Sequence, residues 1–290
     1  MHHMIPWLAC LLPAGASQTH RTWARPLVCL VGIVCLIGQM TLWNSLVQGA
    51  ENTAAREQAQ QWTAEARTLA RAGNITQAEE LLKQALALVE QVFGPEHLHI
   101  ATSLDSLADF YWTQRRWGEA EALYQRALQI REAALGPAHP AVATSLNHLG
   151  DLYRAQGRWS EAEPLLQRAL QIRDVALGPA HPDVALTLNN LGFLYYNQGR
   201  WADSEALHQR ALQIREVALG PRHLDVARSL LNLGLLYTRQ GRWGEAKPLL
   251  QRALQIREAA LGPAHHLVAQ SLNILAAVYS GQGRWGEAEP

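Results

Sequence analysis

An arginine–tryptophan pair recurs at a fixed step of 42 residues along most of the chain. The tryptophans of these pairs are Trp117, Trp159, Trp201, Trp243 and Trp285. A Gly-Pro turn recurs at the same step, with its glycines at Gly94, Gly136, Gly178, Gly220 and Gly262. A period of about 20–50 residues is typical of architectures in which one supersecondary unit is stacked many times. Stepping back once more from Trp117 reaches Ile75, which predicts a more divergent first unit.

Each unit reads as two helices. Over residues 140–156 the apolar side chains recur at spacings of four, three and four, the stripe of an amphipathic helix; they are Val142, Leu146, Leu149 and Tyr153. Gly157 then predicts a left-handed stop, and a second helix follows over about 159–176. Gly150 on the first helix and Ala162 on the second are small enough to let the two approach closely.

One such pair cannot cover its own apolar stripe, so successive pairs must stack. We therefore predict an all-α fold: a right-handed α-solenoid of stacked antiparallel helix pairs, preceded by one hydrophobic N-terminal helix. The first helices should line a concave face. The array should span residues 51–290, after an N-terminal segment of residues 1–50. The predicted units are about 55–96, 97–138, 139–180, 181–222, 223–264 and 265–290, the last one truncated.

The residues of these helices resemble the tetratricopeptide repeat family. The matching positions are Leu149, Gly150 and Tyr153 in the first helix and Ala162, Leu166 and Ala169 in the second. The 42-residue step and the recurring ALGPxHPxVA and QRALQIRE wording are similar to the kinesin light chain subclass, over residues 55–290. The resemblance implies a non-catalytic scaffold that binds an extended peptide or partner protein in the concave groove.

The N-terminal segment contains an apolar run over residues 27–46, about long enough to span a bilayer. Arg21 and Arg25 precede it, and Glu51 is the first charge after it. The positive-inside rule then predicts a membrane anchor with the repeats exported, periplasmic if the chain is bacterial. A signal peptide cleaved near Gly49-Ala50, which would release a secreted protein, is the alternative, and a buried soluble helix is a third.

Charge, cysteine positions and the absence of catalytic motifs argue against several classes of function. The formal net charge is zero, so the chain lacks the basic field that drives non-specific nucleic-acid binding, and we expect no nucleic-acid partner. All three cysteines precede residue 50, which excludes a disulfide framework or a cysteine-based zinc site in the repeats. No GxSxG, HExxH, GxGxxG or Walker sequence occurs, so we predict no enzyme activity, no catalytic residues and no cofactor.

Three periodic features invite a chemical interpretation. The histidines that recur once per turn are His97, His139, His181, His223 and His265. They lie about one unit apart, too far to share a metal ion, so we expect helix-start residues that bond local backbone and no metal site. His208 is expected to be a tolerated core residue, and the tryptophans to pack at the turns. The arginine rows that contain Arg126 and Arg131 are expected to form a solvated face.

Function should reside in first-helix positions that vary between units while the scaffold stays constant. One row gives Asp105, Asn147, Asn189, Leu231 and Asn273; the next gives Asp109, Asp151, Phe193, Leu235 and Ala277; a third gives Trp112, Arg154, Tyr196, Thr238 and Ser280. With the adjacent residues Arg228, Asn232 and Arg239, the varied polar and apolar members of these rows are the candidates for a peptide groove.

Each candidate type has a chemical reason. Asparagine offers donors and an acceptor to an extended backbone, aromatic and leucine side chains supply apolar anchors, and Arg154, Arg228 and Arg239 are suited to select acidic groups. The resemblance adds that an asparagine in the first row contacts the peptide backbone; Asn147, Asn189 and Asn273 match, and Leu231 breaks the row.

Two further functions stay open. The repeats can be the regulatory or sensor arm of a larger enzyme or signalling protein whose effector domain lies beyond residue 290. Alternatively, the chain is a structural spacer that self-associates through the uncovered C-terminal end of the array. The sequence does not separate these from a peptide-binding adaptor.

Overall fold

A computed structural model describes residues 48–282, and within them the chain is helical apart from short turns, with no strand. Residues 48–58 are helical and belong to a small N-terminal unit; the repeats belong to a second compact unit, Ala59–Pro290. In this second unit residues 59–71 form a helix. The helices that follow are α2 (Ile75–Phe93), α3 (Leu98–Thr113), α4 (Trp117–Leu135), α5 (Pro140–Ala155), α6 (Trp159–Leu177), α7 (Pro182–Asn197), α8 (Trp201–Leu219), α9 (Leu224–Arg239), α10 (Trp243–Leu261) and α11 (His266–Gly281).

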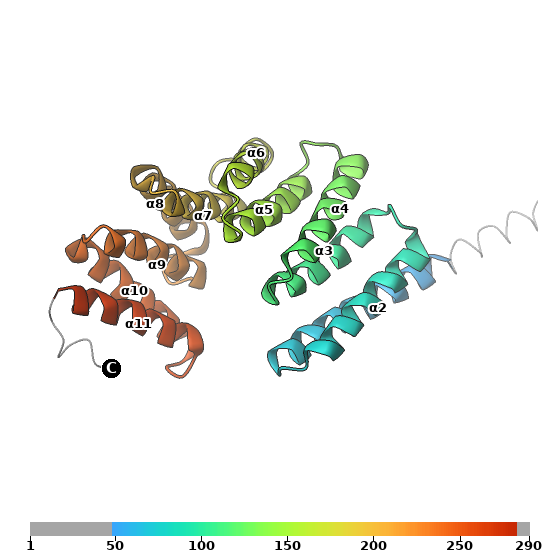
Figure 1. The fold of residues 1–290 in the computed structure, drawn as a ribbon, viewed down its shortest axis with the longest axis horizontal. Coiled ribbons are helices and arrows are strands. Elements are labelled where there is room, and N and C mark those ends of the chain that lie inside the picture. Colours follow the sequence, from blue (N-terminus) through green and yellow to red (C-terminus); the bar gives the residue numbers. More distant parts are fainter. Residues whose placement is uncertain (1–47, 283–290) are drawn as a thin grey trace, which may run out of the picture. The chain divides into compact units, whose positions relative to one another are not determined.

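The helices are stacked as pairs. α3 packs on α4, α5 on α6, α7 on α8 and α9 on α10, and each second helix also packs on the first helix of the next pair (Figure 1). Consecutive first helices also contact each other, α5 with α7, α7 with α9 and α9 with α11. The predicted all-α stack of helix pairs is confirmed. We call the outward surface of α3, α5, α7, α9 and α11 the first-helix face.

The recurring histidines start the first helices. His139 Nδ1 accepts a hydrogen bond from the backbone N–H of Ala141 at 3.1 Å, and the other four histidines do the same two residues on. A helix start leaves backbone N–H groups without a partner inside the helix, and the imidazole satisfies one of them. The prediction of local capping is confirmed.

Close packing inside each pair depends on glycines of the first helices. A Cβ on Gly150 would lie 2.6 Å from Leu166 Cγ, and one on Gly234 would lie 2.6 Å from Leu250 Cδ2. A side chain therefore has no room at these positions unless the second helix moves away. In the turn between helices Gly157 has φ +75°, as predicted, whereas Arg115 holds the equivalent left-handed position with φ 58°.

A tyrosine, an arginine and a glutamate join each helix pair to the one before it. Tyr153 donates its hydroxyl to Glu121 Oε1 at 2.8 Å, and Arg158 Nη1 lies 2.7 Å from Glu121 Oε2. The Arg158 guanidinium also lies over the Tyr153 ring, 4.0 Å from its centroid. The same trio recurs around Glu79, Glu163 and Glu205. We call this arrangement the inter-pair staple. At the next position Lys247 replaces the glutamate and lies 4.8 Å from the Tyr279 ring centroid.

The two periodic arginine rows do not share one environment. Arg126, Arg168, Arg210 and Arg252 are partly exposed and pair with acids of the preceding second helix at 2.5–2.8 Å. The other row, Arg131, Arg173, Arg215 and Arg257, is buried, with 7, 3, 2 and 6 % of each residue exposed. The prediction of a solvated face is wrong for this second row, because these side chains pass inward between first helices.

The tryptophans pack to different degrees. Trp117 and Trp243 join the core clusters, and Trp243 lies so close that a Cβ on Gly281 would be 2.7 Å from its Cη2 atom. Trp159 and Trp201 are 37 and 41 % exposed, more than predicted. The places equivalent to Gly281 are occupied by Asn197 for Trp159 and Arg239 for Trp201, which are too large to admit an indole ring.

The membrane prediction lies outside the described residues, since the apolar run spans 27–46. Within residues 48–282, none of the helices combines the length and apolar character needed to cross a bilayer.

Candidate functional site

The predicted groove residues all lie on first helices, from α3 to α11, but they are not equally available. Asp105, Asn147, Asn189 and Asn232 are buried. Asp109, Arg228, Arg239 and Asn273 are exposed, and the remaining candidates are half-buried: Trp112, Asp151, Arg154, Phe193, Tyr196 and Leu235. The first-helix face therefore has a buried polar floor with a varied rim.

At the α3–α4 pair the floor contains a complete ion pair. Asp105 accepts hydrogen bonds from both terminal nitrogens of Arg131, one of them Nη1 at 3.2 Å, and Arg131 Nη1 also donates to Ser145 of α5. His148 Nδ1 lies 3.8 Å from Asp105 Oδ1. Burial by itself would raise the pKa of Asp105, but bonding to His148 and Arg131 outweighs it and lowers the pKa. Asp105 is therefore a charged structural partner here.

The following pairs keep the arginine and lose the acid. The guanidinium Nη1 atoms of Arg173, Arg215 and Arg257 donate to hydroxyls of the next first helix; the acceptors are Thr187 at 2.6 Å, Ser229 at 2.7 Å and Ser271 at 3.0 Å. Within residues 48–282 none of these arginines has a carboxylate at ion-pair distance. Where α3 has Asp105, the next three first helices have Asn147, Asn189 and Leu231. Burial lowers the pKa of all three guanidinium groups, that of Arg215 to about 10.

Asn147 shows the consequence of this replacement. Its side chain is 4 % exposed, and its Oδ1 atom has no hydrogen-bond partner. A buried amide oxygen without a partner is unfavourable because it has lost its hydrogen bonds to water. The floor between α5 and α7 thus contains both an unpaired cation and an unsatisfied amide.

Asn189 belongs to a buried network instead. Its Oδ1 lies 2.9 Å from His208 Nδ1 and its Nδ2 donates to Ser229 Oγ at 3.3 Å, which in turn accepts from Arg215. His208 is 1 % exposed, which confirms the prediction of a core residue. Burial, followed by the nearby Arg215 charge, lowers the pKa of His208 to about 4, so the ring is neutral at pH 7 and donates from Nδ1.

The half-buried rim carries aromatic and charged groups. Arg154 Nη2 pairs with Asp151 at 2.7 Å, and its guanidinium lies 5.7 Å from the centroid of the Phe193 ring on α7. Phe193 in turn meets the His208 ring edge-on at 5.5 Å. These contacts cross from α5 to α7, so the candidate residues Asp151, Arg154 and Phe193 form one continuous surface.

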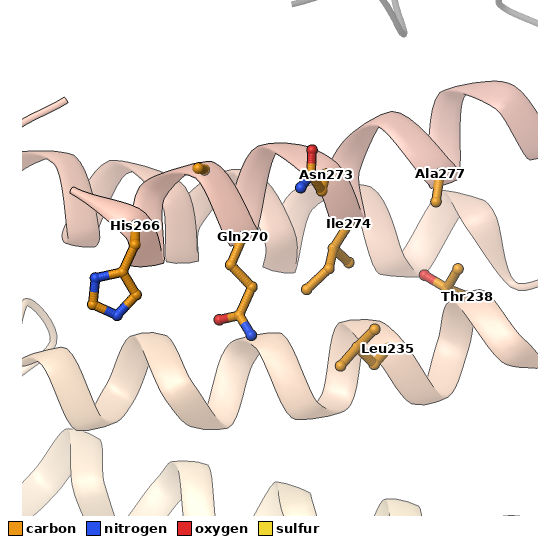
Figure 2. A pocket seen from close by; sticks show the side chains of 8 residues that line it. Leu235, Thr238, His266, Gln270, Asn273, Ile274 and Ala277 are labelled. Atoms are coloured by element: carbon orange, nitrogen blue, oxygen red, sulfur yellow. The ribbon is translucent and has the colours of Figure 1, made fainter. Parts of the chain in front are cut away.

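A hollow of about 490 Å³ opens on the first-helix face between α9 and α11. Figure 2 shows side chains of both helices turned toward it; the lining residues are Leu235, Thr238, His266, Ala269, Gln270, Asn273, Ile274 and Ala277. Arg257 reaches it from behind, since its Nη1 donates to Gln270 Oε1 at 3.0 Å. The hollow has an apolar end at Leu235 and Ala277 and a polar end at His266 and Gln270.

Four of these lining residues stand in the variable rows predicted from the sequence: Leu235, Thr238, Asn273 and Ala277. The buried arginines were not predicted. A signal existed: a serine or threonine follows each of these arginines at a constant spacing, while the acid that precedes the first one is replaced in the later units. Within the described part of the chain, no cluster of three or more histidine, cysteine or acidic side chains could hold a metal ion.

These features define an α-solenoid built from helical hairpins, with a polar, arginine-rich floor on its first-helix layer. The tetratricopeptide repeat family matches residues 59–132, 100–175, 183–258 and 225–290, which together cover most of the sequence. The chain belongs to the tetratricopeptide repeat family. Repeats of this family are generally protein–protein interaction scaffolds and are typically non-catalytic.

Solved structures place it near kinesin-light-chain-like members. BtubC (BKLC) from P. vanneervenii is 26% identical, with a TM-score of 0.58 over 82% of this chain and 87% of that one. A putative kinesin light chain from Podosopora anserina with nearly identical TPR-like repeats is 25% identical, with a TM-score of 0.58 over 70% of this chain and 96% of that one. PilF of Pseudomonas aeruginosa shares the fold at 18% identity and a TM-score of 0.54, over 82% of this chain and 88% of that one. Among curated proteins none matches the sequence.

Proposed function

We propose that the first-helix face holds an extended, acidic segment of a partner protein and performs no chemistry on it. The observation that carries the proposal is the set of three buried guanidinium groups, Arg173, Arg215 and Arg257, none of which has a carboxylate at ion-pair distance among the described residues. The more distant carboxylates of Asp183 and Asp225 only partly offset the effect of burial on Arg173 and Arg215. A buried charge without a counter-charge is costly, and an anionic side chain of a ligand would offset that cost. Asp105 supplies this counter-charge internally at the α3–α4 pair, where it bonds Arg131.

The rim fits the same kind of partner. Phe193, Tyr196 and Leu235 are half-buried apolar side chains on successive first helices, α7 and α9. Aromatic and apolar anchors in partly enclosed positions dominate most peptide interfaces. An extended segment laid across α5 to α11 would thus place apolar side chains on the rim and carboxylates toward the floor.

Binding of labelled peptides to the full-length chain tests this function. The probes are nine-residue peptides of one apolar sequence carrying three glutamates, three glutamines or three lysines, followed by fluorescence anisotropy. We expect the glutamate peptide to bind at least tenfold more tightly than the glutamine peptide, with an affinity that falls as salt rises. Arg215→Gln should remove most of this preference.

Arg210→Gln is the matched control, because Arg210 lies on the same helix, α8, but on the exposed row paired with Asp174. It should leave the preference intact, and circular dichroism checks that both variants stay helical. Equal binding of the glutamate and glutamine peptides would contradict the proposed function.

We further propose that the N-terminal apolar run, residues 27–46, displays the repeats outside the cytoplasm, either as an anchor or as a signal cleaved near Gly49-Ala50. The support is the pair Arg21 and Arg25 before the run and the absence of a basic residue in the run itself. Protease protection of the repeats in spheroplasts, where only the cytoplasmic membrane shields the cell interior, would contradict export, and the N-terminal residue of the mature protein distinguishes the two forms. The sensor-arm and self-association alternatives stay predictions.

A further inference from the structure

One first-helix position places an extra cation next to the buried arginine row. Arg228 on α9 is exposed, and the equivalent residues of the other first helices are uncharged: Thr102, Thr144, Leu186 and Gln270. Arg228 Nη2 lies 2.9 Å from Asp225 Oδ1, a contact between two well-exposed groups that uses one of five guanidinium donors. Most N–H donors of Arg228 are therefore not used by the contact with Asp225.

Arg228 is not one of the eight lining residues, but the register of the stack places it on α9 beside the polar end of the hollow between α9 and α11. Gln270 occupies on α11 the place that Arg228 occupies on α9, and these two first helices pack side by side. Figure 2 shows Gln270 and His266 projecting from α11 toward α9. Behind them, Arg257 Nη1 donates to Gln270 Oε1 and to Ser271 Oγ, both at 3.0 Å.

The electrostatics agree with this placement. Burial lowers the pKa of Arg257, and the charge of Arg228 lowers it further, so the two guanidinium groups disfavour each other's charge. Arg215, on the other side of α9, responds to Arg228 in the same way. Two neighbouring cations that raise each other's free energy form a site that an anion between them would stabilise.

We propose that the polar end of the hollow, lined by Gln270 and His266 with Arg228 and Arg257 beside it, binds the phosphate group of a phosphorylated side chain in the partner segment. This inference rests on the proposed function and specifies one position of the ligand. The apolar end at Leu235, Ile274 and Ala277 takes the carbon part of the same or a neighbouring side chain.

The chain itself indicates why phosphate fits better than carboxylate. At the α3–α4 pair, the two oxygens of Asp105 match the two terminal nitrogens of a single guanidinium, Arg131. In and beside the hollow, donors come from two arginines on different helices together with a side-chain amide and an imidazole. A phosphate ester carries about −1.5 to −2 charges and three acceptor oxygens, which matches this larger and more strongly positive set.

Saturation-transfer NMR on the full-length chain tests the site with two small probes, phenyl phosphate and benzoate. Both have one aromatic ring for the apolar end, and they differ in the anionic group. We expect phenyl phosphate to bind at least tenfold more tightly than benzoate. Arg228→Thr, which copies the residue found at Thr144, should weaken phenyl phosphate about tenfold without loss of helicity. Arg71→Thr removes an equal charge at an exposed position outside the hollow and should have no effect.

Equal affinities for the two probes, or equal phenyl phosphate affinity in wild type and Arg228→Thr, would overturn the phosphate site. Those outcomes leave the proposed function standing if the glutamate peptide still binds preferentially. If the glutamate peptide shows no preference and phenyl phosphate also binds no better than benzoate, both the proposed function and the phosphate site are contradicted.

Discussion

Both carboxylate oxygens of Asp105 meet the terminal nitrogens of Arg131, at the junction of α3, α4 and α5. The arginine of this pair recurs in three later units, and the aspartate does not. One repeat thus contains its own anion, and the others present the same cation without one. That difference between equivalent positions is what separates a structural interface from a candidate binding site in this stack.

Removing the acid from the complete pair should destabilise the N-terminal repeats. In Asp105→Asn the guanidinium of Arg131 stays buried without a counter-charge, which typically costs about 3–5 kcal/mol. Urea unfolding followed by circular dichroism measures the change, and hydrogen exchange should place it in α3–α5. Glu96→Gln, an exposed acid in the turn before α3, should change stability by less than about 0.5 kcal/mol. A loss as small as that in Asp105→Asn would contradict the structural importance of the pair.

The converse change should supply the missing carboxylate at the α5–α6 pair. Asn147→Asp puts a carboxylate at the position equivalent to Asp105, near the unpaired Arg173, and replaces an amide whose oxygen has no partner. We expect stability to rise by about 1 kcal/mol and the glutamate peptide to bind several-fold more weakly, because the anion site is then filled from within. Asn273→Asp adds the same charge at an exposed position of α11 and should leave stability unchanged. If stability falls in Asn147→Asp, the assignment of Arg173 as an unpaired cation is wrong.

Much of the fold could be predicted because it repeats. The 42-residue step, the capping histidines and the glycine of the first helix each occur several times. Every unit therefore supports the same interpretation as a pair of helices. The environment of the buried arginines could not be predicted this way. An arginine followed by an acid reads as a surface pair, and only the packing of α4 against α3 and α5 shows that the side chain of Arg131 turns inward.

The candidate site was predicted less well for a related reason. Spacing along a helix places Asn147, Asn189 and Asn273 on one face, but their burial depends on the neighbouring helices. Asn147 and Asn189 lie between packed first helices, whereas Asn273 on α11 is exposed. The same residue type in the same row is thus part of the interior in two units and part of the surface in a third.

His208 should make stability depend on pH. Burial lowers its folded-state pKa to about 4, below the ordinary value of 6.5, so the unfolded chain binds a proton at higher pH than the folded chain does. Its contribution is therefore fully present above about pH 6.5 and is lost as the pH falls toward 4, by up to roughly 3 kcal/mol. His208→Leu, which copies Leu166, should lose less stability over this range. Urea titrations at pH 7 and pH 4.5 measure the difference; equal losses in the two proteins would contradict it.

The staple at the C-terminal end of the stack offers a gain-of-stability test. Four tyrosines donate to a glutamate of the preceding pair, whereas Tyr279 faces Lys247 at the equivalent position. Lys247→Glu restores the carboxylate acceptor, and a hydrogen bond to a charged group in this half-buried setting is worth about 1 kcal/mol. Among the described helices α11 packs on α10 and α9 only, so the gain should appear as slower amide exchange in α11 while α5 and α7 stay unchanged. Glu205→Lys is the reciprocal change, and it should accelerate exchange in α9 by a similar factor because it removes the acceptor of Tyr237 and the partner of Arg242. If neither substitution alters exchange in its own helix, the staples do not hold consecutive pairs together, and packing of the apolar stripes alone would have to account for the stack.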